Sequence, residues 1–184
     1  MKSLFIFMAV LFGMLGAYGP ANAETYYYDF STFGYDSGQS LEGLVRDAAA
    51  FTSERSSLSY TPSFGSGLLT ASGGTEDIFI SFSAPVNQVI IRGGDGNTAI
   101  DAFRVTLYEY GTGNLLGTWD TTPFTDWYEL TVTASNIGRV VFDPGNEGRL
   151  PGIIGEGGLI MTHMGYTTVE TEGNERMSVT SVPG

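Results

Sequence analysis

The fold is decided by one stretch, residues 83 to 143, which begins Ser83-Ala-Pro-Val-Asn-Gln-Val-Ile-Ile-Arg92 and continues Phe103-Arg-Val-Thr-Leu-Tyr-Glu-Tyr110. The second segment alternates, with Phe103, Val105 and Leu107 on one side and polar or aromatic residues on the other, which is typical of a half-buried strand. Further β-rich segments follow at Leu115–Trp119, Trp127–Val132 and Ile137–Phe142. Short strands at this spacing, separated by turns that contain Gly, Asn and Asp, predict an antiparallel β-sandwich.

The rest of the chain extends this pattern. We expect further strands at Thr25–Phe30, Leu68–Ala71, Thr75–Ser83 and Leu159–Val169. One segment, Ser40–Phe51, has apolar residues at helical spacing and predicts a short helix, with a strand over residues 48–52 as the alternative. Residues 54–67 are rich in Ser, Gly and Pro and predict a long surface loop. The expected fold class is therefore all-β, an antiparallel sandwich of the jelly-roll, galactose-binding-like kind.

The first 23 residues read as a targeting segment. Lys2 gives a positive start, residues 4–15 are apolar, and Ala21-Asn-Ala23 is a small-x-small cleavage signal. The sequence thus predicts a signal peptide over 1–23, a sandwich domain over 24–169 and a polar tail over 170–184. The expected location is secreted or at the cell surface, extracellular or periplasmic, in a bacterial setting, with no membrane span after cleavage. The chain contains no cysteine, so disulfides contribute nothing.

The charge is strongly acidic. The 184 residues carry 20 acidic and 8 basic side chains, a net charge of −12, and the only lysine lies in the predicted signal peptide. A field of this sign repels phosphate backbones, so nucleic acid is a poor partner. Neutral sugars and cations suit it better, although acidity also serves solubility alone.

Two segments together resemble a known class. Asp77-Ile-Phe-Ile-Ser-Phe-Ser-Ala-Pro-Val86 and the run from Asp101 to Leu116 are similar to exported bacterial proteins with a galactose-binding-like jelly roll, many of them of the PEP-CTERM type. The resemblance implies a carbohydrate-binding-module-like sandwich that often carries a structural calcium. The sorting tail of that type, Pro-Glu-Pro before an apolar segment, is not found, and Met161-Thr-His-Met164 stands where such domains often have an Asp pair.

Aromatic residues on the predicted exposed face are candidates for sugar binding. Aromatic rings stack on the apolar faces of sugars, while nearby carboxylates and amides bind hydroxyl groups. The alternative is that the tryptophans are core or rim packing residues. The predicted ligand-binding residues are Tyr108, Tyr110, Trp119, Trp127, Asp120 and Asp126.

One loop has the composition of a cation site. Asp95-Gly-Asn-Thr-Ala-Ile-Asp101 gathers carboxylate and amide oxygens, the ligands that calcium prefers. We hypothesise a calcium ion held by Asp95, Asn97 and Asp101. The alternative is an ordinary Asp/Asn/Gly turn whose side chains bond their own backbone.

The sequence carries no catalytic signature. His163 is the single histidine, cysteine is absent and there is no Gly-x-Ser-x-Gly motif, so zinc sites and nucleophile–histidine pairs are not indicated. His163 is expected to be a packed strand residue. Paired carboxylates remain the one catalytic device that this composition leaves open.

These observations predict a non-enzymatic exported protein that binds a polysaccharide or surface glycan, or takes part in an extracellular matrix. The alternatives are a structural or adhesive surface protein without a small ligand and, less favoured, a carboxylate-dependent glycan hydrolase.

Overall fold

The computed structural model describes residues 23–62, 65–70, 76–96, 100–144 and 159–169. The predicted signal peptide, except Ala23, and the predicted tail from residue 170 lie outside these ranges. Within them the structure is almost entirely antiparallel β-sheet, with one short 3₁₀ turn, η1 (Phe30–Thr32), and no α-helix. No helix in this part of the chain has the length and apolar character needed to cross a membrane.

In the described ranges ten strands form one continuous hydrogen-bonded sheet that folds into two layers. Their bounds are β1 (Thr25–Asp29), β2 (Leu44–Arg46), β3 (Ala49–Ser53), β4 (Ser59–Thr61), β5 (Gly67–Leu69), β6 (Ile78–Gly94), β7 (Arg104–Glu109), β8 (Leu115–Asp120), β9 (Trp127–Asp143) and β10 (Ile160–Thr168).

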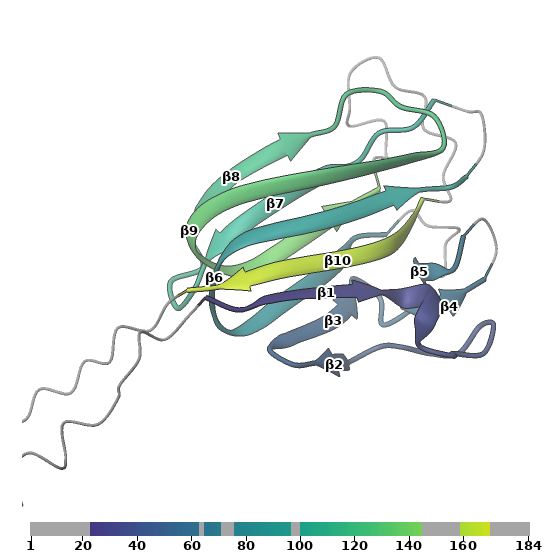
Figure 1. Cartoon of the computed structure of the whole chain (residues 1–184), viewed down its shortest axis with the longest axis horizontal. Coiled ribbons are helices and arrows are strands. Elements are labelled where there is room, and N and C mark those ends of the chain that lie inside the picture. Colours follow the sequence, from purple (N-terminus) through teal and green to yellow (C-terminus); the bar gives the residue numbers. More distant parts are fainter. Residues whose placement is uncertain (1–22, 63–64, 71–75, 97–99, 145–158, 170–184) are drawn as a thin grey trace, which may run out of the picture. The chain divides into compact units, whose positions relative to one another are not determined.

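The two long strands β6 and β9 belong to both layers. The first half of β6 pairs with β3 and with the second half of β9, which in turn pairs with β7. The second half of β6 pairs with β10 and with the first half of β9. Layer I therefore consists of β1, β10, the second half of β6 and the first half of β9, with the β4–β5 hairpin attached to β10. Layer II consists of β2, β3, β7, β8, the first half of β6 and the second half of β9. Figure 1 shows β6 and β9 running across the molecule with β10 and β1 beside them.

Strands β6 and β9 pass from one layer to the other at the same height in the sandwich. The β6–β9 register shifts between Ser81 and Gln88, where Pro85 lies, and Asn136 in β9 has a left-handed φ of 63°. Tyr110 holds the two bends together: its backbone N–H donates to the Asn136 carbonyl at 2.7 Å, and its hydroxyl donates to the Ser83 carbonyl at 2.8 Å. Gly138 permits this approach, because a Cβ there would lie 2.4 Å from the Tyr110 Cα.

The core lies between the layers and joins them through aromatic contacts. Phe82 of layer II packs against Tyr166 of layer I with ring centroids 5.0 Å apart. Gly93 of layer I faces the rings of Phe103 and Phe142, which lie 3.0–3.2 Å from the place of a Cβ. The predicted inward residues Phe103, Val105 and Leu107 are buried, and so are the alternating residues Ile78, Ile80 and Phe82 of β6. The prediction of an antiparallel β-sandwich is confirmed.

Three local predictions need correction. Residues 40–51 form no helix, because Leu44–Arg46 and Ala49–Ser53 pair as the β2–β3 hairpin. The helical spacing there coincides with a strand whose alternate residues Ala49 and Phe51 are fully buried. The predicted loop 54–67 contains strand β4, and the four predicted strands over 75–92 and 127–142 are two continuous strands, β6 and β9.

A buried tyrosine pair fastens the β2–β3 hairpin to layer I. The Ala48 N–H donates to the Tyr166 hydroxyl at 3.0 Å, and the Tyr28 hydroxyl donates to Asp47 at 2.7 Å. The two hydroxyls lie 3.3 Å apart. Asp47 forms the turn with a φ of 47°. Burial, followed by these hydrogen bonds, raises the pKa of Tyr28, so its phenol stays protonated and can donate.

We predict that Tyr166→Phe lowers the free energy of unfolding by about 1–3 kcal/mol, because the Ala48 N–H loses its acceptor in a partly buried place. Tyr26→Phe is the matched control: its ring stacks on Tyr166, but its hydroxyl bonds the exposed Glu24, so little change is expected. Urea denaturation of both variants measures the difference. Equal losses in the two variants would contradict the role of the hairpin contact.

Candidate functional site

The structure does not bring the six predicted ligand residues together. Tyr108, Trp119 and Asp120 lie on the β7–β8 hairpin of layer II, Tyr110 lies in the turn after β7, and Trp127 and Asp126 lie at the start of β9 in layer I. Trp119 pairs with the buried Val105 and points to the same side, so it packs against the core. Tyr110 binds to the bends of both β6 and β9, and the residue is 37% exposed.

Aromatic and charged side chains on the outer face of layer II contact other side chains of the protein. Arg104 donates from Nε and Nη2 to the two carboxylate oxygens of Asp120, at 2.6 and 3.0 Å. Arg139 lies 4.2 Å from the centre of the Tyr108 ring. The bonds from Arg104 lower the pKa of Asp120. Two of the residues predicted for ligand binding, Tyr108 and Asp120, are therefore each engaged by an arginine of the protein.

The outer face of layer I has a different character. Strands β1, β10, β6 and β9 lie side by side, and their registers align outward residues in rows. We call this surface the Tyr27 face. Its three central rows, read from β1 to β9, are Thr25–Thr167–Gln88–Thr133, Tyr27–Gly165–Ile90–Thr131 and Asp29–His163–Arg92–Glu129; Trp127, opposite Gly94, follows at one end.

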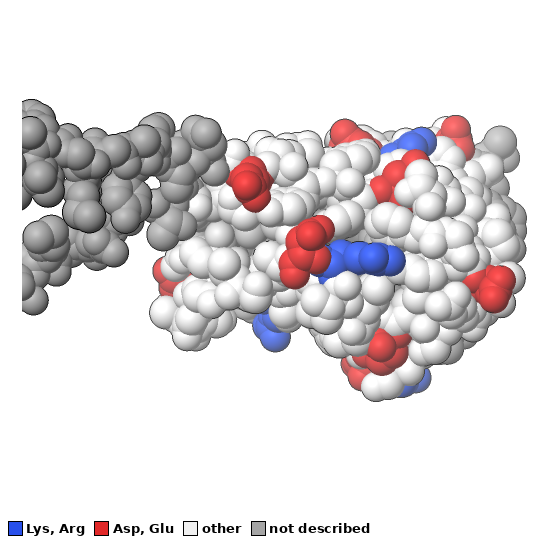
Figure 2. Space-filling model, turned by 60° about the horizontal axis from the view of Figure 1, so that its bottom comes forward, with Lys and Arg blue, Asp and Glu red and all other residues white. Residues whose placement is uncertain are grey.

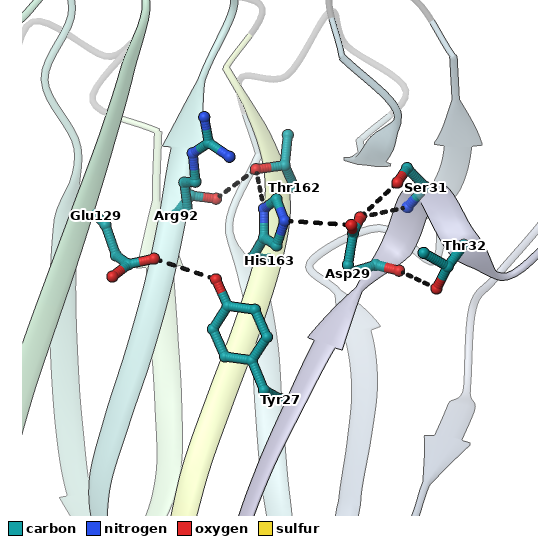
Figure 3. A network of polar contacts seen from close by, with 8 residues as sticks. All are labelled: Tyr27, Asp29, Ser31, Thr32, Arg92, Glu129, Thr162 and His163. Atoms are coloured by element: carbon teal, nitrogen blue, oxygen red, sulfur yellow. Dashed lines mark hydrogen bonds and ion pairs between the residues drawn. The ribbon is translucent and has the colours of Figure 1, made fainter.

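Tyr27 forms a flat aromatic surface at the middle of this face. Its Cδ2 lies 2.9 Å from the place of a Cβ on Gly165, so only glycine allows the ring to lie over β10. Its hydroxyl donates to Glu129 Oε2 on β9 at 3.1 Å, which holds the ring across the strands. Figure 3, which looks onto the strands, shows the ring open to the viewer. Tyr27 is 50% exposed, so one side of the ring is available to a ligand.

Polar and charged groups surround the ring. His163 lies beside it, with ring centroids 5.6 Å apart, and His163 Nε2 is 3.6 Å from Asp29 Oδ2. Asp29 also accepts from the N–H and the hydroxyl of Ser31, and these bonds lower the pKa of its carboxyl. His163 Nδ1 lies 2.9 Å from Thr162 Oγ1 (Figure 3). His163 is half-buried on a strand, as expected, but it faces outward and belongs to this surface.

A shallow groove continues the face beyond Tyr27. It encloses about 400 Å³ and is lined by Asn87, Gln88, Thr133, Ala134, Ser135 and Thr167. Three of these residues, Gln88, Thr133 and Thr167, form the polar row next to Tyr27. The face thus combines an exposed ring with hydroxyl and amide groups, the mixture that sugar rings and their hydroxyls require.

Of this face, sequence reasoning predicted only Trp127, because the residues come from four segments far apart in the chain. Tyr27 stands in the run Tyr26-Tyr-Tyr28, in which all three residues are alike. Which of them faces outward becomes clear only from the pairing of β1 with β10. The usable signal was His163 with Gly165: a histidine and a glycine on the outward side of an otherwise buried strand.

Two of the three predicted metal ligands do come together. Asp95 and Asp101 are buried, with 5% and 1% exposure, and hydrogen-bond each other. Within the described residues Asp101 Oδ2 has no hydrogen-bond partner, while the Asp101 backbone pairs with Phe124 at 2.8 and 3.0 Å. Burial, and then the charge of Asp95, raises the pKa of Asp101 to about 7. Asn97 lies outside the described residues.

Two buried carboxylates with an unpartnered oxygen are a donor set that fits a hard cation. Because burial and the charge of Asp95 raise the pKa of Asp101, the pair without a cation retains a proton below about pH 7. In the described ranges no three His, Asp or Glu side chains gather as metal ligands. A cation held here would therefore need backbone carbonyls or water in addition to the two carboxylates.

The surface charge is dispersed. Figure 2 shows one side of the molecule, on which acidic side chains are scattered among uncharged ones and no extended basic patch forms.

Comparison with known proteins yields similarities of architecture only. No family model matches the chain, and no curated protein matches its sequence. Among solved structures, a xylan-binding module, CBM86, from Roseburia intestinalis aligns with a TM-score of 0.38 and 11% identity over 79% of this chain and 94% of that one.

Two further solved structures align in the same range. The family 32 module of C. perfringens NanJ, in complex with galactose, gives a TM-score of 0.37 and 9% identity over 79% of this chain and 93% of that one. The K2 cleaved adhesin domain of Lys-gingipain gives a TM-score of 0.37 and 14% identity over 84% of this chain and 96% of that one.

We predict that Asp101 makes the cation-free fold less stable as pH rises from about 4 to 7. Its pKa is about 7 in the fold, above the ordinary 3.8, so its contribution is complete below about pH 4 and is lost as pH rises through 7. Thermal unfolding in chelator across this range measures the effect, and Asp101→Asn should flatten the dependence. A wild-type stability that rises from pH 4 to 7, or the same slope in the variant, would contradict this account.

Proposed function

We propose that this chain is an exported, non-catalytic carbohydrate-binding protein whose Tyr27 face holds a polysaccharide or surface glycan. The observation that carries the proposal is the Tyr27 ring, which lies flat over Gly165 with one side open and its hydroxyl held by Glu129. Export rests on the signal peptide predicted over residues 1–23. An extracellular or surface location follows from that prediction.

The physical basis is the two-sided nature of a sugar. A pyranose presents C–H groups on its faces, which pack against an aromatic ring, and hydroxyls at its edge, which need donors and acceptors. The Tyr27 face supplies a ring fixed in place before binding, so little conformational entropy is lost on association. Threonine, glutamine and histidine side chains on both sides of the ring supply the polar partners.

We propose in addition that Asp95 and Asp101 hold a calcium ion that stabilises the loop between β6 and β7. The support is the unpartnered buried oxygen of Asp101 beside a second carboxylate. Calcium would replace the retained proton and satisfy that oxygen. The role is structural, since the pair is buried.

The binding prediction concerns one ring. Glycan affinity, measured by calorimetry with the best ligand of a polysaccharide and glycan array, should fall at least about tenfold in Tyr27→Ala, because a stacking surface and its Glu129 contact are lost. Tyr108→Ala is the matched control, a half-buried tyrosine on the opposite face. Unchanged affinity in Tyr27→Ala, with a loss in Tyr108→Ala, would place binding on the other layer.

An array that stays silent with calcium and with chelator would overturn the carbohydrate-binding proposal. If light scattering then showed calcium-dependent assembly, the chain would be a structural or adhesive protein. Product release from a polysaccharide, abolished by one Asp or Glu substitution, would instead establish a hydrolase.

The calcium prediction is separate. At pH 8, millimolar calcium should raise the melting temperature of the wild-type chain, because only the fold presents both carboxylates. Asp101→Asn should lose most of this rise, whereas Asp120→Asn, which removes an exposed carboxylate bonded to Arg104, should keep it. An equal rise in all three proteins would show that calcium acts elsewhere.

A further inference from the structure

One cation of the Tyr27 face has unused hydrogen-bond donors. The Arg92 guanidinium lies 5.5 Å from the centre of the Trp127 ring, and within the described part of the chain it forms no hydrogen bond or ion pair. The carboxylates of the same row are engaged: Asp29 by Ser31 and His163, and Glu129 by the Tyr27 hydroxyl. The carboxylates of this row thus already bond within the protein, whereas the donors of Arg92 remain for a ligand.

The geometry suits a planar anion. A guanidinium presents parallel N–H groups that match the two oxygens of a carboxylate, and such paired bonds are about twice as strong as neutral ones. Contact with an indole ring restricts the side chain and lowers the cost of fixing it. Gly94 leaves space beside Trp127, because a Cβ there would lie 2.8 Å from the ring.

Arg92 lies close to the aromatic surface formed by Tyr27. Arg92 stands in the row next to Tyr27, two residues further along the strands, which is about 7 Å. Trp127 lies opposite Gly94, in the same direction. A sugar lying on Tyr27 therefore has Arg92 within reach of its neighbour in the glycan chain.

We propose that Arg92 and Trp127 form a subsite for the carboxylate of a uronic acid, in a glycan whose adjoining sugar lies on Tyr27. This inference rests on the proposed carbohydrate-binding function. The negative net charge of the protein opposes the approach of an acidic glycan, but at physiological ionic strength this repulsion is screened beyond about 8 Å. The contact with Arg92 acts at shorter range.

The test compares each acidic polysaccharide with its carboxyl-reduced form, in which the same sugar is neutral. We expect the wild-type chain to bind uronic-acid polysaccharides at least about tenfold more tightly than their reduced forms. Arg92→Gln should bring the two affinities together while binding of the reduced form persists. Arg139→Gln is the matched control, because Arg139 also lies over an aromatic ring but on the opposite face.

The outcomes separate the two proposals. If wild-type chain binds reduced forms as well as acidic ones, or if Arg92→Gln keeps the preference, the uronate subsite is wrong and the carbohydrate-binding function stands. If the preference disappears equally in Arg139→Gln, the effect is one of net charge and the subsite is also wrong. If no glycan of either kind binds, both proposals fail.

Discussion

The passage of β6 and β9 from one layer to the other is the constraint on which the rest of the structure depends. Each strand has 17 residues and serves both layers, so both must bend at the same level and in the same direction. Tyr110 bonds to the two bends at once, and Gly138 leaves room for it. Once this crossing is fixed, β10 and β1 can only extend layer I, and β7 and β8 can only extend layer II. The Tyr27 face is a product of that arrangement.

Much of the fold could be predicted from local pattern. The alternation in residues 103–107 indicates which side chains are buried, and the structure buries the predicted ones. The continuity of β6 and β9 could not be read, because Pro85 and the polar residues at the bends resemble strand ends. The β2–β3 hairpin was hidden for a similar reason: its apolar residues fall at spacings that a helix would share.

The candidate site was less accessible to sequence reasoning than the fold. Trp119 and Tyr110 carried the composition expected of a sugar-binding surface, but cross-strand pairing places the first on the core side and makes the second a brace. Tyr27 carried no such signal. Its role depends on a glycine 138 residues away in sequence and on Glu129 from a third strand, and these contacts exist only when β1, β10 and β9 are in register. The Asp95–Asp101 pair was found because it is local in the chain.

The central claim is that a glycan lies on the Tyr27 ring. Amide chemical-shift mapping by NMR during titration with the best array ligand tests it most directly. The account predicts that the largest shifts fall on Gly165, Ile90 and Thr131, which share the row of Tyr27, while Thr106 and Thr118 on the outer face of layer II stay unchanged. Shifts confined to the β7–β8 hairpin would contradict the account.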